Sequence, residues 1–449
     1  MPHADLHGLN LSTASAAAAD AFNDTVLSYL RYRSDISLNL QKTLAADPGF
    51  ALGHVLKGYI MMLGYKQALV PTAAEALRTA ERLLDGASSR EQAHAAALGA
   101  WVEGDLDRAI GTWEQILDDH PTDVLALRVH HFNSFWLGRP AAMARQVEKA
   151  LPRWGADLPG WGTLLACRCF AHEELGNYTL AEASGRDAID FDKGDLWAAH
   201  AVAHILEMQG RCGEGIDWLA GLEPYWEGAN NLKHHLWWHR GLYHFERGEF
   251  DTVLELYDRH FRNLSSPLTQ AQPDLYIDIQ NAASMLFRLE LRGVDVKARW
   301  VEIADKAEER IGDCLSPFTL PHWMMALAAL RRFEAGGRML EAMRACATGA
   351  NINARMVRDY ALPISEALLL RARGDPAAAC RVMRPAIGGM FRLGGSHAQQ
   401  DVFEQLFLDC AIAAGTNDDV ALILERVTGR HPVSPERRMG YKHAVKDLS

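Results

Sequence analysis

The sequence predicts an all-α protein, a right-handed α-solenoid of stacked helix pairs, and three observations support this prediction. A turn signal, Gly followed by a polar or charged residue, recurs along the chain at nearly constant spacing. No stretch sustains the alternation of apolar and polar residues that marks a half-buried strand. The chain has 449 residues, of which 49% are hydrophobic, and this length is too great for one compact core. Helical repeats remove the difficulty, because each repeat buries its apolar stripe only against its neighbours.

The turn signal gives the length of the repeat. The first five glycines lie 34, 38, 34 and 38 residues apart, which is the period of a two-helix repeat of tetratricopeptide type. In such a repeat the glycine ends the first helix, helix A, and the second helix, helix B, begins just after it. The signal occurs at Gly104-Asp105, Gly138-Arg139, Gly176-Asn177, Gly210-Arg211, Gly248-Glu249 and Gly374-Asp375.

The residues after Gly104 match the expected helix B. Ala109 lets the two helices approach closely, Trp113 fills the space between them, and Pro121 closes the unit. Division of the chain length by the period gives about ten to twelve helix pairs, with atypical capping segments at both ends. We therefore expect one continuous domain over residues 21–440, between a flexible N-terminus at 1–20 and a tail at 441–449.

Composition excludes several classes of partner. Basic residues (46) and acidic residues (57) are mixed along the chain, the net charge is −11, and no basic stripe suits a nucleic-acid backbone. No apolar run approaches the roughly 20 residues that span a bilayer, and no secretory signal begins the sequence. The seven cysteines are scattered, which is typical of reduced thiols in a cytoplasmic protein. We expect a cytoplasmic protein without nucleic-acid or membrane partners.

Histidines form the second signal. Two pairs, His200 with His204 and His235 with His239, have the i, i+4 spacing that places both side chains on one helix face. Counting back from the repeat glycines assigns both pairs to A helices of consecutive repeats, and A helices line the concave surface of such an array. We expect all four histidines on or near this inner surface, with Glu207 as a fifth polar member.

Three interpretations of the histidines remain open. Two histidines from each of two neighbouring helices can hold a Zn or Fe ion if their Nε2 atoms lie within about 4 Å of one another. The segment HAVAH at 200–204 lacks the Glu of the HExxH protease motif, so that class of enzyme is disfavoured. The histidines can also form a small-molecule or acid–base site. Finally, they can serve only as hydrogen-bonding residues between stacked helices, beside Trp237 and Trp238.

A polar stripe follows in the next repeat. Asp278, Asn281 and Ser284 lie at i, i+3 and i+6 of an otherwise apolar segment, and burial of such a stripe costs free energy unless partners or a ligand satisfy it. We expect a contact between Asp278 and the helix of His235 and His239. A His–Asp pair would raise the histidine pKa and suit a general acid or base, or it would simply fix the repeat register.

A glycine-rich segment predicts the start of a late helix. Gly394 and Gly395 precede Ser396, which suits an N-cap, and Gln399 stands at the capping-box position. Such a helix start can receive an anion or carboxylate, or it can be a plain cap. No Lys-Ser/Thr pair follows the glycines, so a phosphate-binding loop is excluded.

Several strings also resemble the tetratricopeptide repeat protein 38 family. The resemblance runs from about residue 20 to about residue 440 and implies a helical, cytosolic protein, while it leaves the activity open. The strings are WAAHAVAHILEMQGR, WWHRGLYHFERGEFD, ASMLFRLELRGVDVKARW, LGGSHAQQDVFEQL and LERVTGRHPVSPERR.

This resemblance implies a set of polar site residues from distant repeats. His322 and Asp359 begin separate helices, and an array curled enough to bring them towards the histidines would enclose a small ligand. Three residues depart from the family pattern: Asn281 replaces an acid, His397 replaces Asn, and Gln400 replaces a base. The implied set is His200, His204, Glu207, His235, His239, Asp278, His322, Asp359, Ser396, Gln399 and Asp401.

Two functions follow. The first, favoured because recognition is the commonest use of this fold, is binding of a small molecule or peptide on the concave surface. Its ligand-binding residues would be Glu207, Asn281, His322, Asp359, Ser396, Gln399 and Asp401. The second is an enzyme of hydrolase or lyase type, with acid–base or metal-assisted chemistry. Its catalytic residues would be His200, His204, His235, His239 and Asp278, and a transition metal, if present, would bind the four histidines.

Overall fold

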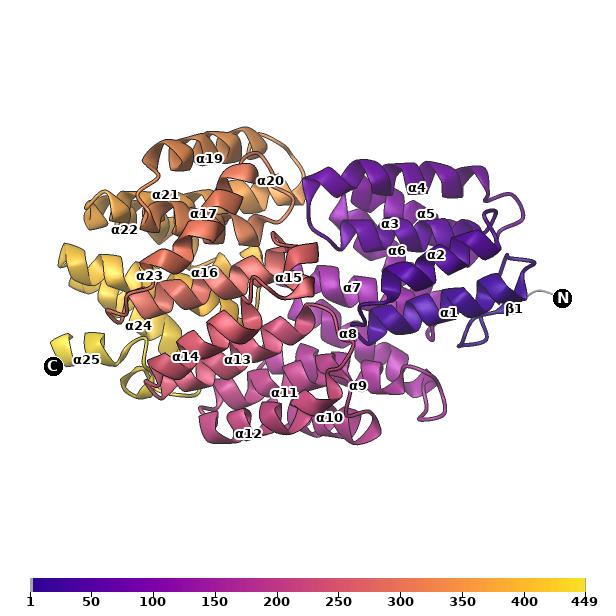
Figure 1. Cartoon of the computed structure of the whole chain (residues 1–449), viewed down its shortest axis with the longest axis horizontal. Helices are drawn as coiled ribbons and strands as arrows, with labels where there is room; N and C mark the ends of the chain where they lie inside the picture. Colours follow the sequence, from indigo (N-terminus) through magenta and orange to yellow (C-terminus); the bar gives the residue numbers. More distant parts are fainter. Residues whose placement is uncertain (1–2, 449) are drawn as a thin grey trace. The chain divides into compact units, whose positions relative to one another are not determined.

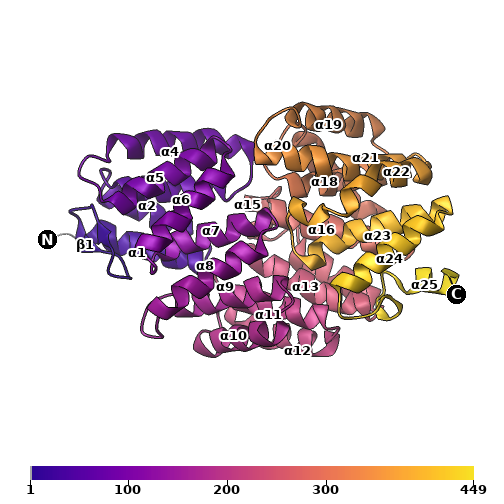
Figure 2. The same cartoon turned by 180° about the vertical axis from the view of Figure 1, so that it is seen from behind.

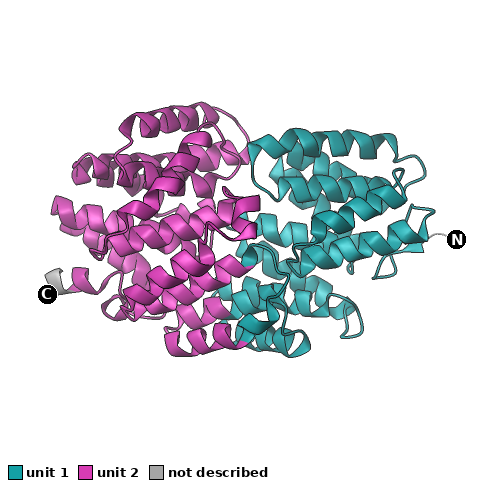
Figure 3. Cartoon of the chain, in the orientation of Figure 1, with its two compact units in different colours: residues 1–202, 222–232 teal, residues 203–221, 233–449 magenta. Residues whose placement is uncertain are grey.

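The computed structural model describes residues 3–448, with side chains through residue 445, and confirms the all-α fold class. Residues 1, 2 and 449 of the predicted end segments lie outside the described residues. The chain divides into two compact units, one formed by residues 1–202 and 222–232, the other by 203–221 and 233–449 (Figure 3). Among the described residues, none of the helices is both long and apolar enough to cross a membrane.

The first unit consists of helices that pack in consecutive pairs (Figure 1). Its pairs include α1 with α2, α3 with α4, α5 with α6, and α9 with α10. The α-helices are α1 (Ala16–Leu30), α2 (Ile36–Ala46), α3 (Ala51–Met62), α4 (Val70–Arg82), α5 (Ser89–Val102), α6 (Leu106–Asp119), α7 (Val124–Trp136), α8 (Pro140–Ala150), α9 (Trp161–Glu174) and α10 (Tyr178–Phe191). Short 3-10 turns are η1 (Gln67–Leu69), η2 (Leu151–Arg153) and η3 (Glu223–Tyr225).

Three helices carry the chain from the first unit into the second. They are α11 (Leu196–Met208), α12 (Cys212–Leu222) and α13 (Leu232–Glu246). The unit boundary crosses α11 after Val202, so the residues on either side of it belong to one continuous helix.

The second unit continues the pairing, for example α21 with α22 and α23 with α24 (Figure 2). Its α-helices are α14 (Phe250–Leu256), α15 (Pro267–Ala271), α16 (Tyr276–Glu290), α17 (Trp300–Glu309), α18 (Leu320–Ala329), α19 (Phe333–Cys346), α20 (Ile352–Met356), α21 (Leu362–Ala372), α22 (Pro376–Ile387), α23 (His397–Ala414), α24 (Asn417–Arg430) and α25 (Lys442–Leu448). Shorter helical segments are the π-helical η4 (Tyr257–Phe261) and η7 (Val357–Ala361) and the 3-10 turns η5 (Lys297–Arg299), η6 (Pro317–Thr319), η8 (Met390–Leu393) and η9 (Pro435–Arg437).

The turn glycines end helices as expected. All six have φ between +62° and +87°, a conformation that only glycine adopts at little cost. At the first of them, Gly104 N–H donates to the carbonyl of Trp101 at 3.0 Å, and Asp105 N–H donates to that of Ala100 at 2.8 Å. The Asp105 side chain then accepts from Arg108 N–H at 3.1 Å and caps α6. One Gly-polar dipeptide therefore ends helix A and begins helix B.

Trp113 fills the space between α5 and α6, as the repeat pattern predicts. The side chain is fully buried, and its Nε1–H donates to the Tyr59 hydroxyl at 2.9 Å. The ring meets that of Trp101 edge to face, with 5.5 Å between centroids. Aromatic packing of this kind stabilises the repeat stack beyond the area it buries.

A small hairpin precedes the first helix. Strands β1 (His3–Ala4) and β2 (Asn10–Leu11) pair antiparallel, with His3 opposite Leu11. Asp5 closes the turn, because its Oδ1 accepts from the backbone N–H of His7 and of Leu9, each at 2.9 Å. Strands of two residues are too short to leave an alternating pattern in the sequence.

One pair of cysteines differs from the prediction of reduced thiols. Cys314 and Cys346, 32 residues apart, form a disulfide. The helices between them fold the chain back on itself, so the segment before α18 meets the end of α19. The other five cysteines are free thiols, and all but Cys212 are buried.

Candidate metal and ligand site

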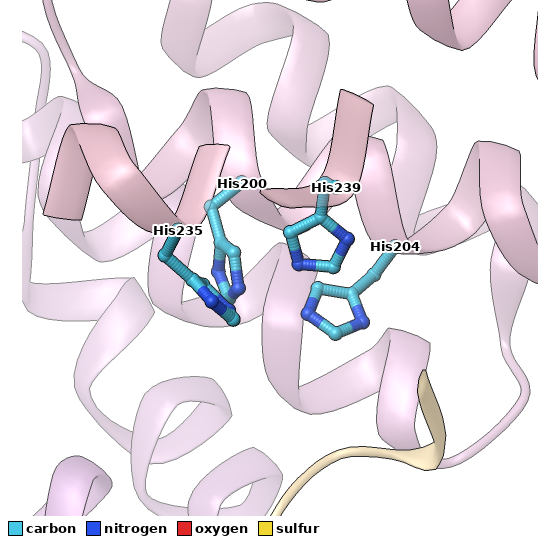
Figure 4. Close-up of side chains that lie close together, drawn as sticks. All are labelled: His200, His204, His235 and His239. Carbon is cyan, nitrogen blue, oxygen red and sulfur yellow. The ribbon is translucent and has the colours of Figure 1, made fainter. Parts of the chain in front are cut away.

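Two helices bring the four predicted histidines together. Helix α11 carries His200 and His204 one turn apart, and α13 carries His235 and His239 in the same way. All four side chains are buried, none more than 3% exposed. Figure 4 shows their rings gathered at one place between the two helices. The i, i+4 spacing therefore identified a real cluster.

The nitrogen atoms of this histidine cluster lie close to one another. One ligand atom from each histidine is within 4.8 Å of those from the other three. The ring centroid of His239 lies 4.4 Å from that of His204 and 4.7 Å from that of His235. Tetrahedral zinc with bonds of 2.0–2.1 Å needs nitrogens about 3.4 Å apart, so binding would draw the rings inward by small side-chain rotations.

Polar side chains on neighbouring helices contact Nδ1 of two of the rings. His235 Nδ1 donates to Asn281 Oδ1 at 2.7 Å, which leaves the lone pair of that imidazole on Nε2. His239 Nδ1 lies 3.1 Å from Glu207 Oε2 in a similar arrangement. Histidines that ligate metals typically donate their other ring N–H to a carboxylate or carbonyl. The side-chain carbonyl of Asn281 supplies such an acceptor.

Burial keeps two of the four rings, those of His204 and His235, neutral. Burial lowers the pKa of His235 to about 4, and the hydrogen bond with Asn281 only partly opposes this. Burial, with the nearby His235 and His397, lowers the pKa of His204 well below its ordinary value. Only a neutral imidazole can coordinate a metal. At neutral pH these two histidines are therefore in the form that binds an ion.

The carboxyl group of Glu207 has a raised pKa. Burial raises its pKa to about 8, while the guanidinium of Arg288 opposes the shift and the carboxylate of Asp401 adds to it. Most Glu207 side chains therefore carry a proton at neutral pH. A cation bound by the histidines would favour the ionised form, so Glu207 would couple the binding of such an ion to proton release.

Asp278 contacts a histidine that the sequence reasoning did not single out. His234 Nδ1 lies 3.1 Å from Asp278 Oδ2, and both side chains are buried. The expected contact between Asp278 and this helix exists, but the residue is the neighbour of His235. The sequence does contain a signal for the contact between His234 and Asp278. The consecutive histidines His234 and His235 bond to Asp278 and Asn281, which follow one another along the polar stripe of α16.

Ser396 and Gln399 form the predicted capping box at the start of α23. Ser396 Oγ accepts from Gln399 N–H at 3.2 Å, and Gln399 Oε1 accepts from Ser396 N–H at 3.1 Å. Gln400 donates from Nε2 to the carbonyls of Gly394 and Gly395 at 2.9 and 2.8 Å. These residues hold the turn before α23, and their hydrogen bonds are made within the protein.

Asp401 is the centre of a buried ionic network. Its Oδ1 accepts from Arg438 Nη2 and from the Tyr441 hydroxyl, each at 2.6 Å, and its Oδ2 accepts from Gln405 Nε2 at 2.6 Å. Burial alone would raise the pKa of Asp401, but Arg438 and Arg288 hold it well below its usual range. Asp401 is therefore ionised and paired with residues that sequence spacing did not indicate.

His322 and Asp359 lie in different surroundings. His322 Nδ1 donates to the Phe318 carbonyl at 2.9 Å, and its ring packs against those of Phe318 and Phe403, with its centroid 5.1 Å from each. Burial lowers the pKa of His322 to about 3. Asp359 is exposed on η7 and pairs with Arg358 at 2.9 Å. The structure does not bring Asp359 into the buried cluster.

Comparison with known proteins adds information on the fold only. No family model matches the sequence. Yeast Tom70 is similar with a TM-score of 0.39 and 11% identity, over 95% of this chain and 87% of that one. A human IFIT1 dimer with m7Gppp-AAAA is similar with a TM-score of 0.34 and 13% identity, over 98% of this chain and 96% of that one. Naa15/Naa10 bound to HypK-THB is similar with a TM-score of 0.24 and 13% identity, over 91% of this chain and 68% of that one. All three TM-scores are below 0.5, so the helical-repeat fold rests on the paired helices and turn glycines of the chain itself.

Proposed function

We propose that this helical-repeat protein binds a divalent transition metal at the histidine cluster and uses the ion to recognise a small-molecule ligand. One observation carries the proposal: four buried histidines place their ligand atoms within 4.8 Å of one another. Two of them are also oriented by acceptors on Nδ1. Four imidazoles in a site without a thiolate suit Zn²⁺, with Fe²⁺ as the next choice.

Burial of the cluster favours a small ligand over a peptide. Peptide grooves are exposed surfaces, whereas none of the four histidines is more than 3% exposed. A bound ion would give this interior a positive charge, so ligands with an oxygen or nitrogen donor would be attracted to it. We infer that the ion, with three or four of the histidines as ligands, provides the contact that selects the small molecule.

A second function, acid–base catalysis, is supported by Glu207. A carboxyl group that titrates near pH 8 can donate and accept a proton at neutral pH. Glu207 lies 3.1 Å from His239, so the pair offers a route for a proton between carboxyl group and imidazole. With a metal ion beside it, this pair would suit hydrolysis or elimination on the bound small molecule. The family resemblance, which likewise remains a proposal, is compatible with either function.

Metal titration of matched histidine variants tests the proposed function. The full chain is stripped with a chelator, and Zn²⁺ binding is measured by calorimetry and by metal analysis after gel filtration. We expect one equivalent in the wild type and a loss of at least about 100-fold in affinity for His235→Gln. His234→Gln is the control, because His234 is equally buried on the same helix but contacts Asp278.

Two results would contradict the proposal. The first is no stoichiometric binding of Zn²⁺ or Fe²⁺ to folded wild-type protein. The second is equal loss of binding in His235→Gln and His234→Gln, since that would reflect damage to α13 and not loss of a ligand. Acid–base catalysis without a metal would survive either result and would instead depend on Glu207.

A further inference from the structure

A second buried polar cluster surrounds Arg128 in the first unit. Six arginines are buried in the described part of the chain, and five of them have a carboxylate ion pair. Arg128 on α7 is the exception, although its side chain is fully buried. Its Nη2 donates to the Tyr32 hydroxyl at 2.6 Å, and its Nη1 contacts Cys167 Sγ at 3.4 Å. Neither group neutralises the guanidinium, because burial raises the pKa of both.

Asp195 is the acid that acts on this region electrostatically, but it does not pair with Arg128. Its Oδ1 accepts from Ala198 N–H at 2.9 Å and caps α11. Burial raises the pKa of Asp195 to about 6, and the guanidinium of Arg128 only partly opposes this. Asp195 is still mostly ionised at neutral pH, but among the described residues no ion pair joins it to Arg128. A buried charge without a direct partner is costly, so the guanidinium lacks a counter-ion in contact with it.

The polar atoms left without partners around Arg128 are mainly hydrogen-bond donors. Arg128 Nε, the Tyr29 hydroxyl, Trp197 Nε1 and both ring nitrogens of His131 are buried and have no hydrogen-bond partner in the described structure. Burial first, then Arg128, lowers the pKa of His131 well below its ordinary value, so this ring is neutral and offers one N–H. Native proteins rarely leave so many buried donors unsatisfied in one place.

These groups lie together around the guanidinium. Arg128 Cζ is 5.1 Å from the Trp197 ring centroid, 5.6 Å from that of Tyr32 and 5.9 Å from that of Tyr29. The His131 ring centroid lies 6.2 Å from that of Trp197. The result is a cation with aromatic rings on several sides and unused N–H and O–H groups beside it.

We propose that Arg128 is the anchor of a binding site for a small carboxylate. The missing partner has to accept hydrogen bonds and carry negative charge, which describes an oxyanion and excludes water alone as the counter-charge. A single guanidinium balances one negative charge, so a carboxylate fits better than a phosphate dianion. The aromatic rings suit a flat or apolar body attached to the carboxylate. This inference does not depend on a metal at the histidine cluster.

Binding of formate, acetate and benzoate to the full chain tests this site, with sodium chloride at equal ionic strength as the reference. Formate is small enough that its body cannot prevent binding. We expect at least one of the three to bind by calorimetry and to raise the melting temperature, with at least a tenfold loss of affinity in Arg128→Gln. Tyr29→Phe removes only an unpartnered hydroxyl and should weaken binding severalfold without unfolding the protein.

The control is Tyr65→Phe, which removes a buried hydroxyl that donates to Asn133 in the same unit. It should lower the melting temperature and leave carboxylate affinity unchanged. Absence of binding by all three carboxylates would overturn the proposal. Binding that persists in Arg128→Gln, or tighter binding of inorganic phosphate than of any carboxylate, would overturn it as well.

Discussion

Glu207 holds its proton more tightly in the folded protein than in the unfolded chain. Its pKa is about 8 when folded, against an ordinary value of 4.5. The folded state therefore binds more protons between these values, and its stability falls as the pH rises from about 4.5 to about 8. His204 and His235 of the histidine cluster behave in the opposite manner, because burial lowers their pKa and favours their neutral form.

Replacement of Glu207 should change the pH dependence of stability. Glu207→Gln keeps the shape and removes the ionisation, so we expect its melting temperature to exceed that of metal-free wild type at pH 8 by about 2 °C or more. At pH 5 the difference should be small or reversed. Thermal unfolding at both pH values measures this, with Glu75→Gln as an exposed control. A difference between wild type and Glu207→Gln that is the same at both pH values would contradict the assignment.

Loss of the Asn281 side chain, which accepts a hydrogen bond from His235, should weaken metal binding. Asn281→Ala removes the acceptor that orients His235, and we expect Zn²⁺ affinity to fall about 10- to 100-fold. Ser284→Ala, on the same stripe of α16, should change it less than about twofold, because the Ser284 hydroxyl bonds only to the backbone carbonyl of Asn281. Competition with a chromophoric chelator gives both affinities. Equal affinities for the two variants would remove Asn281 from the site.

At the residue scale, sequence spacing predicted the groups that share one helix face and failed for the groups that meet across helices. His200 and His204, or His235 and His239, are one turn apart, and helix geometry fixes their relation. The partnership of His234 with Asp278 depends on the register between α13 and α16. No local spacing encodes that register.

The helix ends are the elements that the sequence predicted best. Positive φ at a turn admits few residues other than glycine, so a Gly-polar dipeptide after an apolar helix is a specific signal. The hairpin at β1 and β2 carries no such signal. The disulfide between Cys314 and Cys346 was missed for a similar reason, because it depends on how far α18 and α19 return towards their starting point.

Two glycine replacements separate the role of the turn from that of helix propensity. Gly176 has φ +77° after α9, while Gly111 lies within α6, and an added Cβ would meet nothing within 4 Å at either position. Gly176→Ala should destabilise the protein by about 1 kcal/mol, since the left-handed conformation is costly for alanine. Gly111→Ala should stabilise it by up to about 1 kcal/mol. Urea denaturation midpoints measure both, and shifts of the same sign would contradict this account of the turns.

At the scale of the whole chain, the repeat period predicted the fold class. The sequence did not predict which polar residues from distant parts of the chain pair with one another. Arg288 Nη2 donates to the Ala398 carbonyl at 2.8 Å, and Asp401 pairs with Arg438, so residues far apart in sequence satisfy one another. The family resemblance predicted Asp401 as a ligand-binding residue, and its pairing with Arg438 could not be read from the sequence. The sequence did not single out Arg128 either, because only the folded structure shows that this arginine lacks a carboxylate partner.

The histidine cluster as a metal centre is the central claim, and anomalous diffraction from crystals loaded with Zn²⁺ tests it most directly. We expect one strong anomalous peak among His200, His204, His235 and His239, with at least three nitrogens at 2.0–2.1 Å. Crystals of the His204→Ala variant, grown and loaded in the same way, should lose this peak. A wild-type structure with full zinc occupancy elsewhere, or with the four imidazoles hydrogen-bonded only to one another and to protein groups, would contradict the claim.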